Sequence, residues 1–465
     1  MTTRSSRDVT AALGASGDPA DAIAPLAQLA DAVTHVPLVD GTMTRFVNFD
    51  YAASAPPLAS VHDAVTAAMS HYASIHRGQS YLSRVSTAAY ERARATIAER
   101  TAARADDVVV FTRNTTDALI LLASATPGRV VHFDIEHHAN LLPWRGGEWS
   151  AVVAQRTVEA SLGALDRELA SRPAALLAVT GASNVTGECP PLATLAELAH
   201  HRGARLAVDG AQLAPHRPID LAGTGIDYLA CSGHKLYAPY GGGALIGRRD
   251  WLDAAAPHQP GGGAVVSVTA DDVRWKASPA RHEGGTPNLV GAVSLGAAFD
   301  ALDTLGFDVI REHEAVLHRR LLTGLQQLGI EVLRIWPAHD DLVAVASFNV
   351  PGHRADLVAA YLSAEHGIGV RGGKFCAHPL LERFGLAETG AVRVSIGLGT
   401  SGEDVSALLA ALQLLVSDGP SWTYAAVDGY LSPSPDPRPP AEHALTGPAA
   451  QPTRQKHEDS IATSA

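Results

Sequence analysis

Short apolar runs alternate with stretches of helical periodicity along roughly the first 300 residues. The runs have the length of strands and lie at Val108–Thr112, Val130–Asp134, Ala175–Thr180 and Arg205–Asp209. Helical periodicity is found over Ala88–Ala103, Ala118–Ala125 and Ala193–His201. Strands that alternate with helices indicate an α/β fold, in which a mostly parallel sheet is covered by helices on both faces. Ligands of such folds bind outside the carboxyl ends of the strands.

Beyond about residue 300 the pattern changes to that of a smaller α+β domain. The elements expected there are a helix at Ile310–Leu328, strands at Ile330–Ile335 and Leu342–Val350, a helix at Ala355–His366, a strand near Val392–Ile396 and a helix at Glu403–Val416. We therefore divide the chain into an N-terminal extension (1–45), a large domain (46–300), a small domain (301–418) and a tail (419–465). The tail is rich in Pro and Ala, and we expect disorder from about residue 430 onward.

Charge and cysteine content limit the binding partners and the cellular compartment expected for the chain. The net charge of -12 argues against a nucleic-acid or anionic-membrane partner, because phosphate contacts require a basic surface. The three cysteines are far apart, match no metal spacing and suggest no disulfide framework, which fits a reducing cytoplasm. We see no signal peptide at the start and no apolar stretch long enough to span a bilayer. A cytoplasmic location is therefore expected.

An acid and a lysine that follow successive apolar runs give the most specific chemical signal. Asp209 closes one run, and Lys235 lies just past the next, beside Ser232 and His234. The amine of such a lysine can form a Schiff base with the aldehyde of pyridoxal 5'-phosphate (PLP). The aspartate can keep the pyridine nitrogen protonated, so that the ring accepts electrons. The pair therefore predicts a PLP enzyme.

Other residues after strands suit the remaining parts of the cofactor. Thr115 and Thr116 would begin a helix whose free N–H groups can hold a phosphate; an ordinary Thr N-cap is the alternative. His137 could stack on the pyridine ring and move protons. A metal site at that histidine pair is the other possibility, but no third ligand lies at suitable spacing. Asn184 could donate to the phenolic oxygen, or it could simply belong to a turn.

The C-terminal third carries a second group of candidates. Cys376 has cationic neighbours, among them Arg371, which favour a thiolate, whereas a buried structural cysteine is the default for an isolated one. Arg393 could clamp a substrate carboxylate with its planar fork, or form a surface salt bridge. A Gly-rich segment containing Thr286 precedes a helix and has the composition of a loop.

An ordered series of motifs carries a resemblance to a known family. The motifs are Asn48-Phe49-Asp50-Tyr51-Ala52-Ala53-Ser54-Ala55, His76-Arg77-Gly78, Asn114-Thr115-Thr116-Asp117, Glu136-His137-His138-Ala139-Asn140 with Pro143-Trp144, Ser183-Asn184-Val185-Thr186-Gly187, Asp209-Gly210-Ala211-Gln212, Ser232-Gly233-His234-Lys235-Leu236-Tyr237, Gly261-Gly262-Gly263, Gly285-Thr286-Pro287-Asn288 and Arg371 to Cys376-Ala377. Over roughly residues 47–416 the chain resembles the class V aminotransferases, which are fold-type I PLP enzymes. Within that family it is similar to the group II cysteine desulfurases and selenocysteine lyases.

The resemblance implies a large domain with a mostly parallel seven-stranded sheet, a smaller α+β domain, PLP as cofactor and a homodimer. It assigns Lys235 as the Schiff-base lysine, Asp209 as the pyridinium partner and His137 as the stacking base. Residues implied to hold the phosphate are Thr116, with its neighbour Thr115, Ser232, His234 and, from the other subunit, Thr286. It implies that Gln212 and Asn184 touch the phenolic oxygen and that Arg393 binds the substrate carboxylate, with Arg371 in support. Cys376 matches the cysteine that attacks the substrate sulfur and carries a persulfide.

Two departures from the family lie where the substrate side chain should sit. Lys374 and Phe375 stand where the family usually has two histidines, and Gly397-Leu398-Gly399-Thr400 replaces a stretch that usually contains Tyr-Asn-Thr. We therefore expect a cysteine desulfurase-like enzyme, with a possible sulfur-acceptor protein as partner. The alternatives are a PLP-dependent C–S lyase, an epimerase or an aminotransferase acting on another amino acid. A further alternative, from a different functional class, is a protein that binds PLP without catalytic activity.

Overall fold

The computed structural model describes residues 22–30, 34–427 and 429–440, and a seven-stranded sheet forms its centre. Across the sheet the strands are β4 (Asp107–Thr112), β10 (Gly243–Arg248), β9 (Tyr228–Ser232), β8 (Arg205–Asp209), β7 (Leu176–Thr180), β5 (Val130–Phe133) and β6 (Trp149–Val152). All run parallel except β10, which is antiparallel to both of its neighbours. The predicted mostly parallel sheet of seven strands is confirmed.

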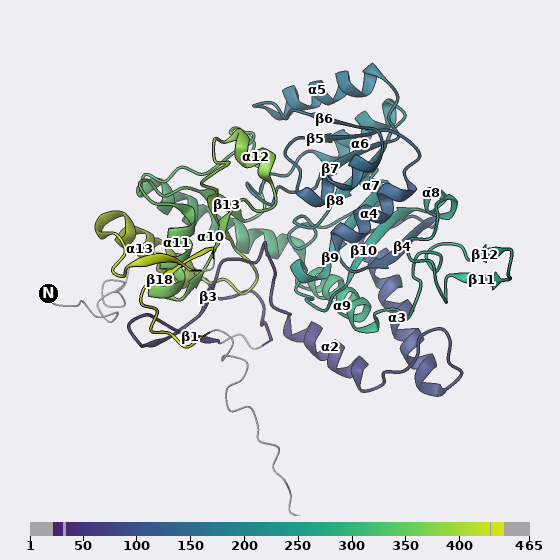
Figure 1. Ribbon diagram of the computed structural model, residues 1–465, viewed down its shortest axis with the longest axis horizontal. Coiled ribbons are helices and arrows are strands. Elements are labelled where there is room, and N and C mark those ends of the chain that lie inside the picture. Colours follow the sequence, from purple (N-terminus) through teal and green to yellow (C-terminus); the bar gives the residue numbers. More distant parts are fainter. Residues whose placement is uncertain (1–21, 31–33, 428, 441–465) are drawn as a thin grey trace, which may run out of the picture.

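Two apolar layers flank this sheet, because neighbouring residues of a strand point to opposite faces. Val108 and Val110 of β4 enter one layer, whereas Val109 between them enters the other. The first layer is covered by α4 (Thr115–Ala125) and α8 (Arg249–Ala254). The second is covered by α2 (Ala59–Met69), α3 (Tyr81–Arg100), α5 (Val158–Ser171), α6 (Leu192–His201), the short α7 (Leu221–Thr224) and α9 (Leu289–Leu305). Figure 1 shows this α/β lobe on the right.

A second lobe, on the left of Figure 1, has its own core. Its main sheet consists of β13 (Val345–Phe348), β16 (Ala391–Ser395) and β15 (Arg371–Gly373), and its helices are α10 (Phe307–Gln327), α11 (Ala355–His366), α12 (His378–Arg383) and α13 (Gly402–Asp418). The short β14 (Ile368–Gly369) pairs in parallel with β3 (Val47–Asn48). Val47 and Phe49 belong to this second core. The predicted boundary at residue 46 is therefore wrong for these residues, which add a strand to the small lobe.

Short elements complete the described chain. They are the hairpins β1–β2 (His35–Pro37 and Met43–Arg45), β11–β12 (Val265–Val268 and Val273–Trp275) and β17–β18 (Tyr424–Val427 and Tyr430–Pro433), and the 3-10 turns η2 (His138–Asn140), η3 (Pro143–Gly146) and η4 (Gly233–Lys235). Among the described residues no single helix has the length and composition needed to cross a membrane. Only α9 and α10 taken together pass that test, and they are bent by 78° at their junction.

Two further expectations from the sequence are wrong. Ile330–Ile335 is no strand and makes a single bridge at Val332, because the Glu188 carboxylate accepts the backbone N–H groups of Ile335 and Trp336, each at 2.7 Å. Disorder from about residue 430 is contradicted by β18. The hairpin is tied to α11 by Glu365, which accepts the Tyr424 hydroxyl at 2.8 Å. The rest of the predicted disorder, residues 441–465, lies outside the described residues.

Candidate active site

The carboxyl ends of the parallel strands bring the predicted site residues to one edge of the sheet. Asp209 is the last residue of β8, and Lys235 ends the 3-10 turn that follows β9. His137 and Asn184 lie in the loops after β5 and β7, and Thr115 begins α4 after β4. A ligand crevice is expected at this edge of an open α/β sheet. Residues far apart in the sequence therefore meet here.

Lys235 is a lysine whose charge is disfavoured by its surroundings. Burial lowers its pKa to about 8, the Asp209 carboxylate opposes that shift, and the positive charge of Arg393 reinforces it. Burial in turn raises the pKa of Asp209, against the effects of the Ala211 N–H, which it accepts at 3.0 Å, and of the Lys235 charge. A buried amine that is readily deprotonated is suited to nucleophilic attack on an aldehyde. The nearby acid suits a pyridinium nitrogen.

His137 is held as a neutral imidazole. Burial lowers its pKa to about 3, and the charges of Lys235, His138 and Arg393 act in the same direction. Its Nδ1 accepts the N–H of Ala139 at 3.0 Å, which leaves Nε2 as the nitrogen that can carry the hydrogen. The neutral ring within the electrostatic reach of Lys235 is suited to stacking on an aromatic ligand.

Unsatisfied hydroxyls support a phosphate site beside the lysine. The buried Oγ atoms of Thr115 and Ser232 have no hydrogen-bond partner within the described ranges. Buried hydroxyls normally find partners, so these two fit a missing ligand that accepts hydrogen bonds. Thr115 lies at the N-terminus of α4, where free N–H groups favour an anion. Gly243 keeps β10 close to that turn, because a Cβ there would lie 2.6 Å from Asn114 Cα. The residues present therefore fit the phosphate and ring of PLP.

Three other predicted phosphate ligands are placed differently. Thr116 is exposed on α4, and His234 is half-buried with a pKa lowered by burial. Thr286 is exposed on the loop before α9, and no contact of its side chain with this site is present in the described chain. That loop is anchored to α3 by Glu283, which accepts from Arg94 Nη2 at 2.8 Å, and to the loop before α3 by Arg77, which donates to Gly285 O at 2.5 Å.

The amides of Gln212 and Asn184 are both bound to backbone oxygens. Gln212 Nε2 donates to Ala52 O at 2.7 Å, and Asn184 Nδ2 donates to Phe375 O at 2.7 Å. Each NH2 group keeps a second hydrogen that could be donated to a ligand. The second bond also ties the loop after β7 to the loop that carries Cys376.

The Cys376 loop is fastened over the edge of the sheet. His138 N donates to Cys376 O at 2.9 Å, and the rings of His138 and His378 meet edge-to-face at 4.5 Å between centroids. Phe375 and Cys376 both have positive φ, 53° and 54°, which is uncommon for residues other than glycine. The thiol is exposed and lies within the electrostatic reach of Lys235 and Arg393. A nucleophilic sulfur therefore lies at the mouth of the crevice.

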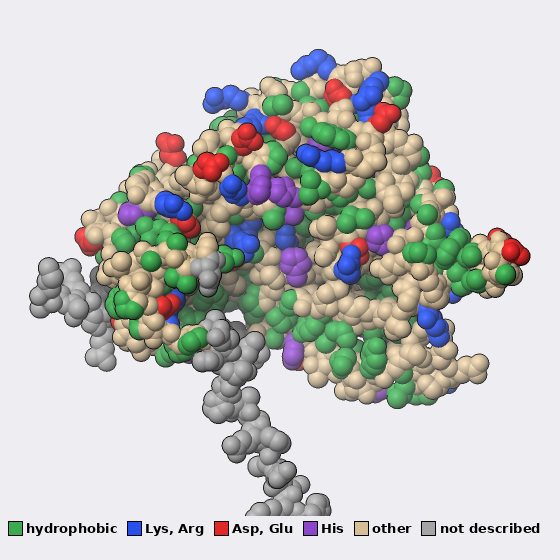
Figure 2. Space-filling view, viewed as in Figure 1, with side chains coloured by type: hydrophobic (Ala, Val, Ile, Leu, Met, Phe, Trp, Pro, Cys, Tyr) green, Lys and Arg blue, Asp and Glu red, His purple; other side chains and the backbone are tan. Residues whose placement is uncertain are grey.

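Arg393 is buried, with 3% of its surface exposed, and burial lowers its pKa. Its Nη1 donates to Asn184 O at 3.1 Å and its Nη2 to Asp50 Oδ1 at 3.1 Å. Arg371 is exposed, and its Nη1 lies 3.9 Å from Asp50 Oδ2. Figure 2 shows Lys, Arg and His side chains around the hollow between the two lobes. Anionic groups are thus favoured there, despite the negative net charge of the chain.

Two acids of this site, Asp50 and Glu136, have no role among the expectations from the sequence. Asp50, in the first motif, is the ion-pair partner of Arg393, 343 residues away in the sequence. Glu136 is fully buried and bonded to Asn140 Nδ2 at 2.8 Å, and its burial raises its pKa well above the usual range. Each acid lies two or three residues beyond the end of a strand, β3 for Asp50 and β5 for Glu136, and that position is the signal that could have indicated them.

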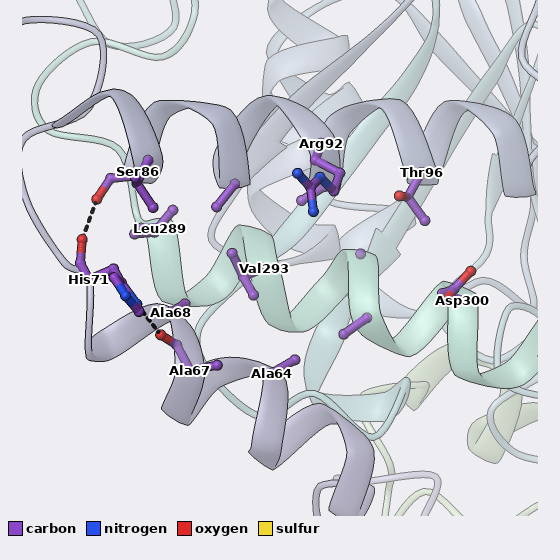
Figure 3. Close-up of a pocket in the computed structure, with 15 residues that line it drawn as sticks. Ala64, Ala67, Ala68, His71, Ser86, Arg92, Thr96, Leu289, Val293 and Asp300 are labelled. Carbon is purple, nitrogen blue, oxygen red and sulfur yellow. Dashed lines mark hydrogen bonds between the residues drawn. The ribbon is translucent and has the colours of Figure 1, made fainter. Parts of the chain in front are cut away.

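A separate cavity of about 430 Å³ lies between α2, α3 and α9, away from this site. Figure 3 shows its alanine-rich wall, with His71 held by Ser86 Oγ and by Ala67 O. None of the predicted site residues lines it. The chemistry described above therefore belongs to the strand ends and not to this cavity.

Comparisons with known proteins agree with the geometry. The model of the Aminotransferase class-V family matches residues 47–408. The chain is 36% identical over 380 residues to a cysteine desulfurase of Dickeya dadantii, covering 78% of this chain and 90% of the relative. It is 35% identical over 389 residues to a cysteine desulfurase of Haloferax volcanii, covering 80% of this chain and 90% of the relative.

Two solved structures show the same similarity. The apo cysteine desulfurase of Thermococcus onnurineus superimposes with a TM-score of 0.74 at 31% identity, over 80% of this chain and 94% of that one. The cysteine desulfurase CsdA of Escherichia coli, in its S-sulfonic acid form, gives a TM-score of 0.70 at 32% identity, over 79% of this chain and 94% of that one.

Proposed function

Because this chain belongs to the class V aminotransferase family of PLP-dependent enzymes, we propose that it removes the sulfur of L-cysteine, releasing L-alanine and leaving a persulfide on Cys376. The observation that carries the proposal is the position of Cys376. Its loop is hydrogen-bonded to the loop of His137 and His138, and its thiol lies within the electrostatic reach of Lys235 and Arg393. A nucleophilic sulfur beside the catalytic lysine is what desulfuration requires and transamination does not.

The residues present divide the reaction between them. Lys235 would hold the cofactor, Asp209 would keep its pyridine nitrogen protonated, and Thr115 and Ser232 would hold its phosphate. Bound PLP supplies an electron sink for the electrons of the substrate's α-carbon. Arg393 would bind the substrate carboxylate, and the free Lys235 amine would take the α-proton, as its lowered pKa allows.

The sulfur transfer then depends on Cys376. Its thiolate attacks the sulfur of the substrate, so that an S–S bond forms while the carbon–sulfur bond of the substrate breaks. The electron pair of the broken bond stays with the carbon fragment, which takes up protons and leaves as L-alanine. In total, the enzyme thiol and L-cysteine give the enzyme persulfide and L-alanine, so no external oxidant or reductant is needed.

A second candidate is favoured by one feature of the pocket. Phe375 is buried and its ring lies 5.2 Å from the Arg393 guanidinium carbon, where the related family usually has a histidine. An aromatic wall at this position suits a bulkier or less polar amino acid. A C–S lyase, epimerase or aminotransferase acting on such a substrate would use Lys235 and Arg393 but would not need Cys376.

The proposal extends to assembly and location. We propose a homodimer in which Thr286 reaches the phosphate site of the partner subunit. The exposed Tyr81, Leu82 and Ile120 support this, because large apolar side chains on a surface favour association. A persulfide must pass its sulfur on, so a sulfur-acceptor protein is the proposed partner. The free cysteines support a cytoplasmic location.

The test is the formation of alanine from L-cysteine by the PLP-loaded protein, run beside Cys376→Ser. Alanine from the parent protein and little from the variant, at equal cofactor content, supports desulfuration through Cys376. Equal alanine formation by both proteins would overturn the role of Cys376. No alanine from either protein, with PLP bound at Lys235, would overturn L-cysteine as substrate and favour the second candidate.

A further inference from the structure

The Arg393 guanidinium is only partly free to receive a carboxylate. Nη1 is taken by Asn184 O and Nη2 by Asp50 Oδ1, each at 3.1 Å. The buried Nε has no hydrogen-bond partner in the described part of the chain. Phe375 covers one face of the guanidinium. Because Nε is the one nitrogen of the group with no partner among the described residues, the edge formed by Nε and Nη2 is the one at which a carboxylate gains most by binding in the plane of the group.

Asp50 already accepts a hydrogen bond from Nη2, one of the two nitrogens of that edge. Bidentate binding of a carboxylate requires two parallel N–H donors of the guanidinium. Nε offers one such donor, while Nη2 already donates one of its two N–H groups to Asp50. An incoming carboxylate and Asp50 would bring two negative charges to the same donor, and like charges in contact repel. A bidentate contact of the carboxylate with Nε and Nη2 is therefore favoured when Asp50 moves away from Nη2.

A second arginine is placed to receive Asp50. Arg371 of β15 and Arg393 of β16 are directly opposed in the antiparallel pair. Directly opposed residues have their side chains on the same face of the sheet. The free oxygen of Asp50, Oδ2, lies 3.9 Å from Arg371 Nη1, which is near enough for an ion pair. The side chain of Arg371 is 56% exposed, so it can adjust to a moving partner.

We propose that Asp50 is a displaceable counter-ion: the substrate carboxylate replaces it on Arg393, and Asp50 shifts to Arg371. Asp50 keeps the buried Arg393 charge compensated while no substrate is bound, and Arg371 acts as a positioning residue for Asp50 and makes no carboxylate contact. Ligands that lack a carboxylate leave the resting pair in place. The inference rests on the proposed function only in that Arg393 receives the carboxylate of an amino acid.

The experiment measures binding rather than turnover. The PLP-loaded protein is titrated with L-alanine, which has no sulfur to transfer, while the visible absorbance of the cofactor is followed, and the same titration is repeated by calorimetry. Ethylamine is the matched control ligand, because it is L-alanine without the carboxylate. Asp50→Asn should lower the dissociation constant for L-alanine about tenfold, the effect of losing one charged competitor for a hydrogen-bond donor. It should not tighten the binding of ethylamine.

Substitution of Arg371 distinguishes the displacement of Asp50 from a direct contact between Arg371 and the substrate carboxylate. In the parent protein, Arg371→Gln should raise the dissociation constant for L-alanine several-fold, because Asp50 loses the group to which it moves. In the Asp50→Asn background the same substitution should have little effect. An equal loss in both backgrounds would show that Arg371 holds the carboxylate directly and would overturn the proposal. Weaker or unchanged binding of L-alanine to Asp50→Asn would also overturn it.

A second variant and a readout that is independent of sulfur transfer keep the titration conclusive. If Asp50→Asn does not accumulate as folded protein, Asp50→Ser carries the same prediction, since it too removes the charge. The titration involves neither Cys376 nor sulfur transfer, so it can be read in a protein that makes no alanine from L-cysteine. Failure of the displacement and failure of the desulfurase proposal are therefore distinguishable.

Discussion

The pH dependence of cofactor attachment follows from the environment of Lys235. Only the neutral amine attacks the PLP aldehyde, and burial lowers the pKa of this lysine to about 8. About a tenth of the amine is then neutral at pH 7 and about nine tenths at pH 9, so attachment should become about tenfold faster between these values. A lysine with an ordinary pKa near 10.4 would gain about a hundredfold over the same interval. Raising the pH speeds attachment in both cases, and the size of the gain distinguishes them.

The assay is the rate at which the visible absorbance of the lysine-bound cofactor appears when the apo protein is mixed with PLP. Lys235→Ala is the control and should give no such band. Asp209→Asn removes the negative charge that opposes the pKa shift, so its rate profile should move to lower pH. A gain close to a hundredfold in the parent protein, or an unmoved profile in Asp209→Asn, would refute this account of the lysine.

Three further predictions concern neighbours of the site. Glu136→Gln should change the free energy of unfolding at pH 7 by less than about 1 kcal/mol, because burial already favours the neutral acid; a loss of several kcal/mol in urea unfolding would show that the carboxyl is ionised. Glu283→Gln should destabilise the protein by up to about 3 kcal/mol in the same assay, because its largely buried partner Arg94 then keeps only the more exposed Glu91 as a counter-ion; an unchanged urea midpoint would contradict this. Gly243→Ala should weaken PLP binding, because the new Cβ would lie 2.6 Å from Asn114 Cα. The control is Gly146→Ala, where no atom lies within 4 Å, and equal PLP affinity of the two variants would argue against the prediction.

The parts of the fold that depend on local pattern could be predicted from the sequence. The runs ending at Asp209 and preceding Lys235 are buried on both faces, so they are continuously apolar and readily recognised. Their polar residues follow at the strand ends, which places the site. The region of Ile330–Ile335 has the same apolar character, but it pairs with β13 only around Val332, and the backbone N–H of Ile335 is taken by the Glu188 carboxylate. A contact of that kind leaves no periodic trace in the sequence.

Other features depend on long-range contacts or on unusual backbone. The pairing of Asp50 with Arg393 joins residues from opposite ends of the chain, and only the folded structure brings them together. The positive φ of Phe375 and Cys376 could not be inferred, because neither is a glycine. The hairpin of Tyr424–Val427 and Tyr430–Pro433 adjoins a Pro-rich stretch, and it is tied to α11 by the Tyr424 hydroxyl, which donates to Glu365 at 2.8 Å and whose residue packs against the second core.

Mass spectrometry of the protein after a single turnover with L-cysteine tests the central claim most directly. The PLP-loaded protein is mixed with one equivalent of L-cysteine without reductant, then alkylated and digested. The account predicts one additional sulfur atom on the peptide that contains Cys376, in an amount equal to the L-alanine released, and none on the peptides of Cys189 or Cys231. L-alanine released with no added sulfur on Cys376 would contradict it.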